Sequence, residues 1–266
     1  GRNWRNLKIL IALGLLLIGN AVFHFEAQAQ GAAEYGIRIG IAVVLMLIML
    51  IGGRIVPSFT RNWLVRENPG RLPVNFNRFD AVSMAVAGIG LLAWIAVPDT
   101  AVTGAALILA GLLQAVRLAR WAGDRTCRDR LVLVLHVAYA FVPIGFVLTG
   151  LVAFDLALPA AGIHAWTGGT AGLMTLAVMS RASLGHTGRP LVASPAVQGI
   201  YALALISALA RICAPFHPTW ELALIQVAGL AWGAAFLGFA IAYWRVFTQP
   251  RPGHRTVVAP PSPAKA

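Results

Sequence analysis

Imidazole side chains give this sequence its widest chemical range, because imidazole binds iron or copper and also carries a proton near neutral pH. The 266-residue chain has six histidines. His217 lies in a Pro-Phe-His-Pro turn, which favours a structural role, and His254 lies in a Pro-rich C-terminal stretch. The histidines that remain as candidates for metal binding or proton transfer are His24, His136, His164 and His186.

Each of these four histidines also has a structural interpretation. His24 could hydrogen-bond to the nearby Glu26. His164 could cap the start of a helix, and His186 could bond to loop carbonyls. His136 differs, because it lies inside an apolar segment, where an ionisable group is costly and usually functional. The sequence favours a metal ligand or a proton relay at His136 and leaves both interpretations open at the other three positions.

Long apolar segments must position these residues. The chain is 59% hydrophobic and only 11% charged, which excludes a water-soluble globular protein. Eight apolar runs are about long enough to cross a bilayer as helices. They are residues 7–25, 36–53, 79–97, 101–120, 131–152, 160–180, 196–213 and 220–244. The sequence therefore predicts an all-α transmembrane helix bundle of about eight helices, forming one domain over residues 1–248.

Cations alternate between rich and poor connections along the chain. Lys and Arg are frequent before the first run, within 54–78, within 117–130, around 181–189 and after 244, and are scarce in the other connections. The positive-inside rule then places both ends of the chain in the cytoplasm. This orientation accounts for the net charge of +12. Nucleic acid is not an expected partner, because no nucleic-acid-binding module accompanies the charge.

Two segments outside the apolar runs are predicted to be irregular. Residues 54–78 form the longest connection between apolar runs. Pro57, Pro69 and Pro73 should interrupt helical structure within it. Residues 249–266 are rich in proline and lack apolar periodicity, so we expect a disordered cytoplasmic tail.

Several chemistries have no support in the sequence. The predicted helices place Cys127 and Cys213 at opposite membrane faces, which argues against a disulfide between them. The sequence has no CxxC motif that would support thiolate-bound zinc or an iron–sulfur cluster. Ser183 precedes His186 by three residues, but no nucleophile elbow or intramembrane aspartate accompanies them, which argues against a hydrolase.

The stretch 162–190, GIHAWTGGTAGLMTLAVMSRASLGHTGRP, carries a family resemblance. Its H-A-x-T-x-G, M-T-L and S-R-A-S-L-G-H-T-G-R-P elements resemble the signature of the NnrS family. These are haem- and copper-containing bacterial inner-membrane proteins linked to denitrification and nitric-oxide stress. GRNWRNL at 1–7, RIVPSFTRNW at 54–63 and LHVAY at 135–139 resemble that family too. Its members carry roughly four further N-terminal helices, so we expect this chain to correspond to their C-terminal two-thirds.

The resemblance implies haem b and copper as cofactors, a multi-pass protein of the bacterial inner membrane, nitric oxide or a related small ligand, and a redox partner. Two histidines can hold opposite faces of one haem only at the same depth. His24 with His164, and His136 with His186, satisfy this condition. The sequence predicts one candidate metal site near each face and does not decide which metal each takes.

Polar residues near the histidines extend these candidate sites. Tyr139 shares a helix face with His136 and could hydrogen-bond a ligand such as nitric oxide, or pack with a satisfied hydroxyl. Arg38 and Arg211 lie near the periplasmic face, where they could meet haem propionates or pair with neighbouring glutamates. The arginines that bracket His186, Arg181 and Arg189, could hold propionates or another anion, or could fix topology through lipid phosphates.

Two other functions remain possible from the sequence. A proton-coupled secondary transporter would use His136 as its proton site, although no internal repeat is visible. A non-catalytic sensor or assembly subunit is the second alternative. The sequence does not decide whether the protein turns over a substrate.

Overall fold

Helices account for most of residues 7–251, the part of the chain that the computed structural model describes, and this part contains no strand. The long helices are α1 (Leu7–Gln30), α2 (Tyr35–Glu67), α3 (Arg78–Ala96), α4 (Ala101–Ala119), α5 (Arg130–Val152), α8 (Pro195–Cys213) and α9 (Glu221–Thr248). Each of these seven is long and apolar enough to cross a membrane. The chain is therefore an all-α bundle that fits a multi-pass membrane protein, as the sequence predicts.

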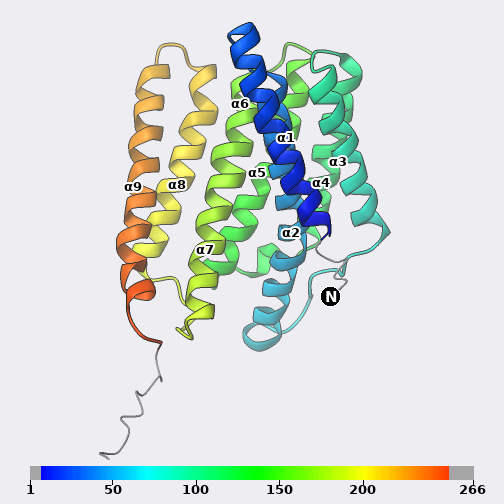
Figure 1. Ribbon diagram of the computed structural model, residues 1–266. Coiled ribbons are helices and arrows are strands. Elements are labelled where there is room, and N and C mark those ends of the chain that lie inside the picture. Colours follow the sequence, from blue (N-terminus) through cyan, green and yellow to red (C-terminus); the bar gives the residue numbers. More distant parts are fainter. Residues whose placement is uncertain (1–6, 252–266) are drawn as a thin grey trace, which may run out of the picture.

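The eighth apolar run forms one rod from three consecutive pieces (Figure 1). These pieces are α6 (Pro159–His164), the π-helix η3 (Ala165–Gly172) and α7 (Leu173–His186). π-helical turns are rare and are frequently found at functional sites. His164 is the last residue before the π-helix, and His186 is the last residue of α7 rather than a loop residue.

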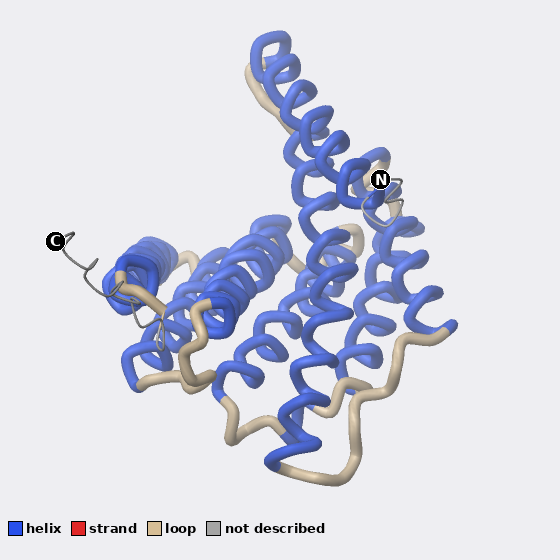
Figure 2. Tube along the Cα trace, turned by 60° about the horizontal axis from the view of Figure 1, so that its bottom comes forward, coloured by secondary structure: helices blue, strands red, loops and turns tan. Residues whose placement is uncertain are grey.

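The helix α5 lies at the centre of the bundle. It packs against α2, α4, α6, η3 and α7, and it buries residues on all sides, including Leu135, Tyr139 and Phe146. By contrast, α1 packs mainly on α2 at the edge of the bundle (Figure 2). Most of the apolar side chains of α1 are exposed. Exposed apolar helix faces of this kind are suited to contact with lipid.

The helix ends form two groups (Figure 1). At one end, α2, α4, α7 and α9 finish and α3, α5 and α8 begin; we name it the arginine-rich end. Polar caps fix the helix starts here: the Asn77 side chain accepts from the Phe79 amide, Asp129 accepts from the amides of Leu131 and Val132, and Ser194 accepts from the Val197 amide. The opposite, arginine-poor end carries His24 and His164.

The predicted end of the second helix at residue 53 is wrong. The sequence predicts a loop after residue 53, but α2 continues to Glu67 and includes Pro57. Val56, Thr60 and Leu64 explain the difference, because their spacing of four places them on one helix face, where all three are fully buried. Burial of that face outweighs the one backbone hydrogen bond that a proline removes. The predicted tail, apart from residues 249–251, lies outside the described residues.

Glycines in the π-helix determine how closely its neighbours approach. A Cβ atom at Gly169 would overlap the Phe141 ring close to its attachment point, whereas at Gly168 it would make ordinary contact with Ala208. We expect Gly169→Ala to destabilise the protein by about 1 to 2 kcal/mol through overpacking. Gly168→Ala, the matched control, should leave thermal unfolding in detergent nearly unchanged. Equal melting temperatures for the two variants would contradict this packing.

Candidate functional site

Buried polar side chains of α3, α4 and α5 form a connected cluster next to the arginine-rich end, and α2 contributes a backbone carbonyl to it. Arg117 of α4 is at its centre and is only 1% exposed. Its Nε donates to Asp80 Oδ1 on α3 over 3.1 Å, and its Nη1 donates to the Met49 carbonyl on α2 over 3.2 Å. Asp80 also lies 3.5 Å from Arg120 and accepts from the Asn77 amide. The buried guanidinium is therefore both paired and hydrogen-bonded, as a buried charge requires.

Tyr139 connects this ion pair to α5. Its hydroxyl accepts from Arg117 Nη1 over 2.9 Å and donates to Gln114 Oε1 over 2.8 Å. Gln114 in turn donates to the Ser83 carbonyl over 3.2 Å. A phenol has one proton to donate, and Gln114 receives it. This arrangement corresponds to the alternative in which Tyr139 packs with a satisfied hydroxyl.

His136 lies one helix turn away on α5 and is only 6% exposed. Its Nε2 lies 2.8 Å from the Thr60 hydroxyl, which donates its only proton to the Val56 carbonyl over 2.9 Å. Nε2 must therefore carry a hydrogen and donate it to Thr60. Nδ1 is buried without a hydrogen-bond partner in the described chain, and Gly123 covers it so closely that a Cβ there would lie 2.5 Å away.

The other predicted metal ligands lie apart from this cluster. His24 is exposed on α1, which packs on α2 and makes no comparable contact with α6, the helix of His164. His164 is half-buried where α6 meets the π-helix. His186 is exposed and lines a cleft to which the buried His136 does not contribute. None of the clefts described for residues 7–251 is lined by both members of a predicted histidine pair.

The predicted arginines occupy different surroundings. Arg38 forms an ion pair with Glu34 at 2.7 Å, the glutamate partner that the sequence allows. Arg211 lies in the last turn of α8, at the same end as His164, and α6 packs on α8. Arg189 donates to the Arg245 carbonyl at the end of α9 over 3.3 Å.

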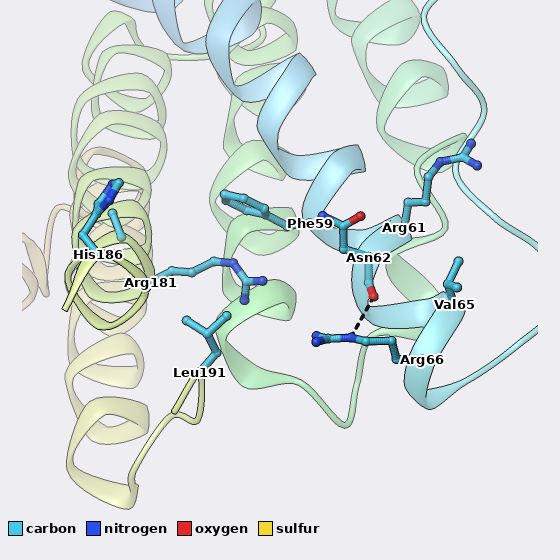
Figure 3. A pocket seen from close by; sticks show the side chains of 10 residues that line it. Phe59, Arg61, Asn62, Val65, Arg66, Arg181, His186 and Leu191 are labelled. Atoms are coloured by element: carbon cyan, nitrogen blue, oxygen red, sulfur yellow. Dashed lines mark hydrogen bonds between the residues drawn. The ribbon is translucent and has the colours of Figure 1, made fainter. Parts of the chain in front are cut away.

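Arg181 lies in a cleft at the arginine-rich end, between α2 and α7. The cleft has a volume of ≈ 700 Å³ and is lined by both helices and by Leu191 (Figure 3). Figure 3 shows Arg181 reaching from α7 towards α2, while Arg66 reaches from α2 towards α7. Together with His186, these residues give the cleft a basic lining with an aromatic wall at Phe59.

The sequence interpretation missed Asp80, Gln114, Arg117 and Thr60. The cation pattern assigns Arg117 a role in membrane topology, yet Arg117 follows Gln114 by three residues on an apolar helix. Two polar side chains on one face of an apolar helix indicate a buried polar contact. Asp80 gave a similar signal, because it is the only acid in residues 68–98.

Of three comparisons with known proteins, one gives a match. Comparison with curated proteins and with solved structures yields no match. The family model described as NnrS protein matches residues 1–251, nearly the whole chain. That span includes the four helices of the buried polar cluster, the π-helix and both walls of the cleft. The chain therefore belongs to the NnrS protein family.

Proposed function

We propose that this protein binds haem b and copper in the bacterial inner membrane and acts in nitric-oxide metabolism or nitrosative-stress defence linked to denitrification. The match to the NnrS family over residues 1–251 is the observation that carries this proposal. The apolar helices support insertion in a bilayer, and the arginine-rich end supports a cytoplasmic location for both ends of the chain. Nitric oxide or a related small molecule is the proposed ligand, and a redox partner is proposed to exchange electrons with the protein.

The four candidate histidines fit a haem to different degrees. His136 fits poorly, because Thr60 occupies its Nε2 and Gly123 covers its Nδ1. His164 fits better: it is half-buried, its ring forms no hydrogen bond within the described chain, and it begins a segment of small residues. His164 would be the residue that holds the haem iron, and Arg211, at the same end of the bundle, would pair with the propionates.

Copper fits the described residues less well. No three His, Cys, Asp or Glu side chains within residues 7–251 come together as a metal-binding group. This part of the chain offers copper single imidazoles, such as those of the exposed His24 and His186. The bound haem would supply an iron able to hold a diatomic gas, while the chain supplies the imidazole and the apolar surroundings.

His164→Ala in the full-length protein tests the haem assignment. We expect it to lose most of the haem that copurifies with the wild type, measured as Soret absorbance and as iron per chain. His217→Ala is the matched control, because His217 is an exposed histidine at the same end and should leave both values unchanged. Full haem content in His164→Ala would refute this ligand.

A further inference from the structure

The cleft at the arginine-rich end exists because two neighbouring helices separate there. The helix α2 packs against the π-helix and α5, but it makes no comparable contact with α7. A second cavity of ≈ 720 Å³ continues the first and shares Arg66, Arg181 and Leu191 with it. The resulting gap is walled by α2 and α7 and closed by the start of α5 (Figure 3).

Positive charge dominates the lining of this gap. Five arginines line the two cavities, against two acids, Glu67 and Asp129. Arg61 is not available to a ligand, because it donates to the Pro73 carbonyl and to Asn75. Arg66 donates only through Nε, to the Asn62 carbonyl over 3.2 Å, among the described contacts. Its guanidinium is otherwise free to face Arg181 across the gap (Figure 3).

The hydrogen-bonding capacity of the Arg181 guanidinium is not fully used within the described chain. Arg181 is only 7% exposed, and its buried Nη1 has no hydrogen-bond partner in the described chain. Asp129 Oδ2 lies 3.8 Å from Nη1, while Asp129 Oδ1 is used to cap α5. The Phe59 ring packs against the guanidinium at 4.4 Å. A buried charge with unmade hydrogen bonds is costly, and an anion that accepted them would offset that cost.

The size and lining of the cleft restrict the kind of anion. Each cavity is far larger than a simple oxyanion. The exposed apolar side chains of Val65 and Leu191 line the first cavity, and those of Leu191 and Val192 line the second. Basic pockets between membrane helices on the cytoplasmic side are suited to acidic lipid headgroups. A planar guanidinium also matches phosphate oxygens in pairs.

We propose that this cleft binds a phosphate-bearing anion between Arg181 and Arg66, with the headgroup of an anionic phospholipid as one source and free phosphate as the other. The phosphate accepts hydrogen bonds from the Arg181 guanidinium, while Val65 and Leu191 contact the attached apolar part. This site is independent of the proposed haem and of nitric-oxide chemistry.

The test uses the purified full-length protein in detergent. In one arm, phosphatidylglycerol and phosphatidylcholine are titrated and bound lipid is counted by native mass spectrometry. In the other arm, thermal unfolding is followed in inorganic phosphate and in chloride at equal ionic strength. Saturable binding of phosphatidylglycerol alone identifies a headgroup site. Saturable stabilisation by phosphate as well identifies a site that the phosphate group alone can occupy.

Variants then locate the binding. We expect Arg181→Gln and Arg66→Gln each to weaken binding about tenfold, the effect of losing a charge-assisted hydrogen bond. Arg66 is exposed, so its variant remains informative if Arg181→Gln fails to fold. Arg78→Gln is the control, because it removes one exposed charge at the same end outside the cleft. Equal binding of both lipids without any phosphate effect, or undiminished binding by Arg66→Gln, would overturn the proposal.

Discussion

Replacing Asp80 with asparagine should destabilise the protein by about 3 to 5 kcal/mol, the effect of leaving one partner of a buried ion pair uncompensated. Arg117, the partner, is almost completely buried and uses Asp80, Tyr139 and a backbone carbonyl to satisfy its charge. Asparagine keeps the size of the side chain but removes the negative charge. The loss should appear as a lower midpoint of unfolding in detergent.

A second ion pair of the chain provides the control. Arg71 and Asp124 also form an ion pair, but their side chains are 57% and 63% exposed. We expect Asp124→Asn to cost less than about 1 kcal/mol, because solvent screens exposed pairs. The double variant Asp80→Asn with Arg117→Met should lose less stability than the sum of the single variants. Equal effects of Asp80→Asn and Asp124→Asn would contradict the buried network.

Thr60→Val should destabilise the protein by about 2 kcal/mol, because it leaves the buried Nε2–H of His136 without an acceptor. The two side chains have nearly the same shape, so packing around α2 and α5 should persist. The same substitution at Thr248 is a close control, since its exposed hydroxyl also donates to the carbonyl four residues earlier. Thr248→Val therefore removes the same backbone contact without affecting a histidine.

Thermal unfolding of the two threonine variants separates these contributions. A larger loss for Thr60→Val measures the His136 contact. A loss no larger than that of Thr248→Val would mean that His136 does not depend on Thr60, and the closed environment assigned to this histidine would be wrong.

The apolar runs predicted the helices, because a membrane-spanning helix requires a long segment of uncharged, apolar residues. The same logic failed at residues 54–67, where exposed arginines alternate with a buried stripe of Val56, Thr60 and Leu64. Each arginine lowers the mean hydropathy of the segment, whichever face of the helix carries it. The four-residue spacing of these three residues was the sequence signal from which a longer α2 could have been predicted.

The sequence predicted at which end of the bundle a candidate residue lies, but not which helices it faces. The sequence placed His24 and His164 at the same end of the bundle, and the structure has them at that end. Which helices become neighbours depends on packing that hydropathy does not encode, so it could not show that α1 lies on α2 at the edge. For the same reason, the contact between Arg117 and Asp80 was invisible, although each residue was an unusual charge in or beside an apolar helix.

The optical spectrum of the purified full-length protein from cells supplied with iron and copper tests the central claim most directly. We expect a Soret band with stoichiometric iron, and a shift of that band when nitric oxide is added to the reduced protein. A colourless protein without iron or copper would contradict it.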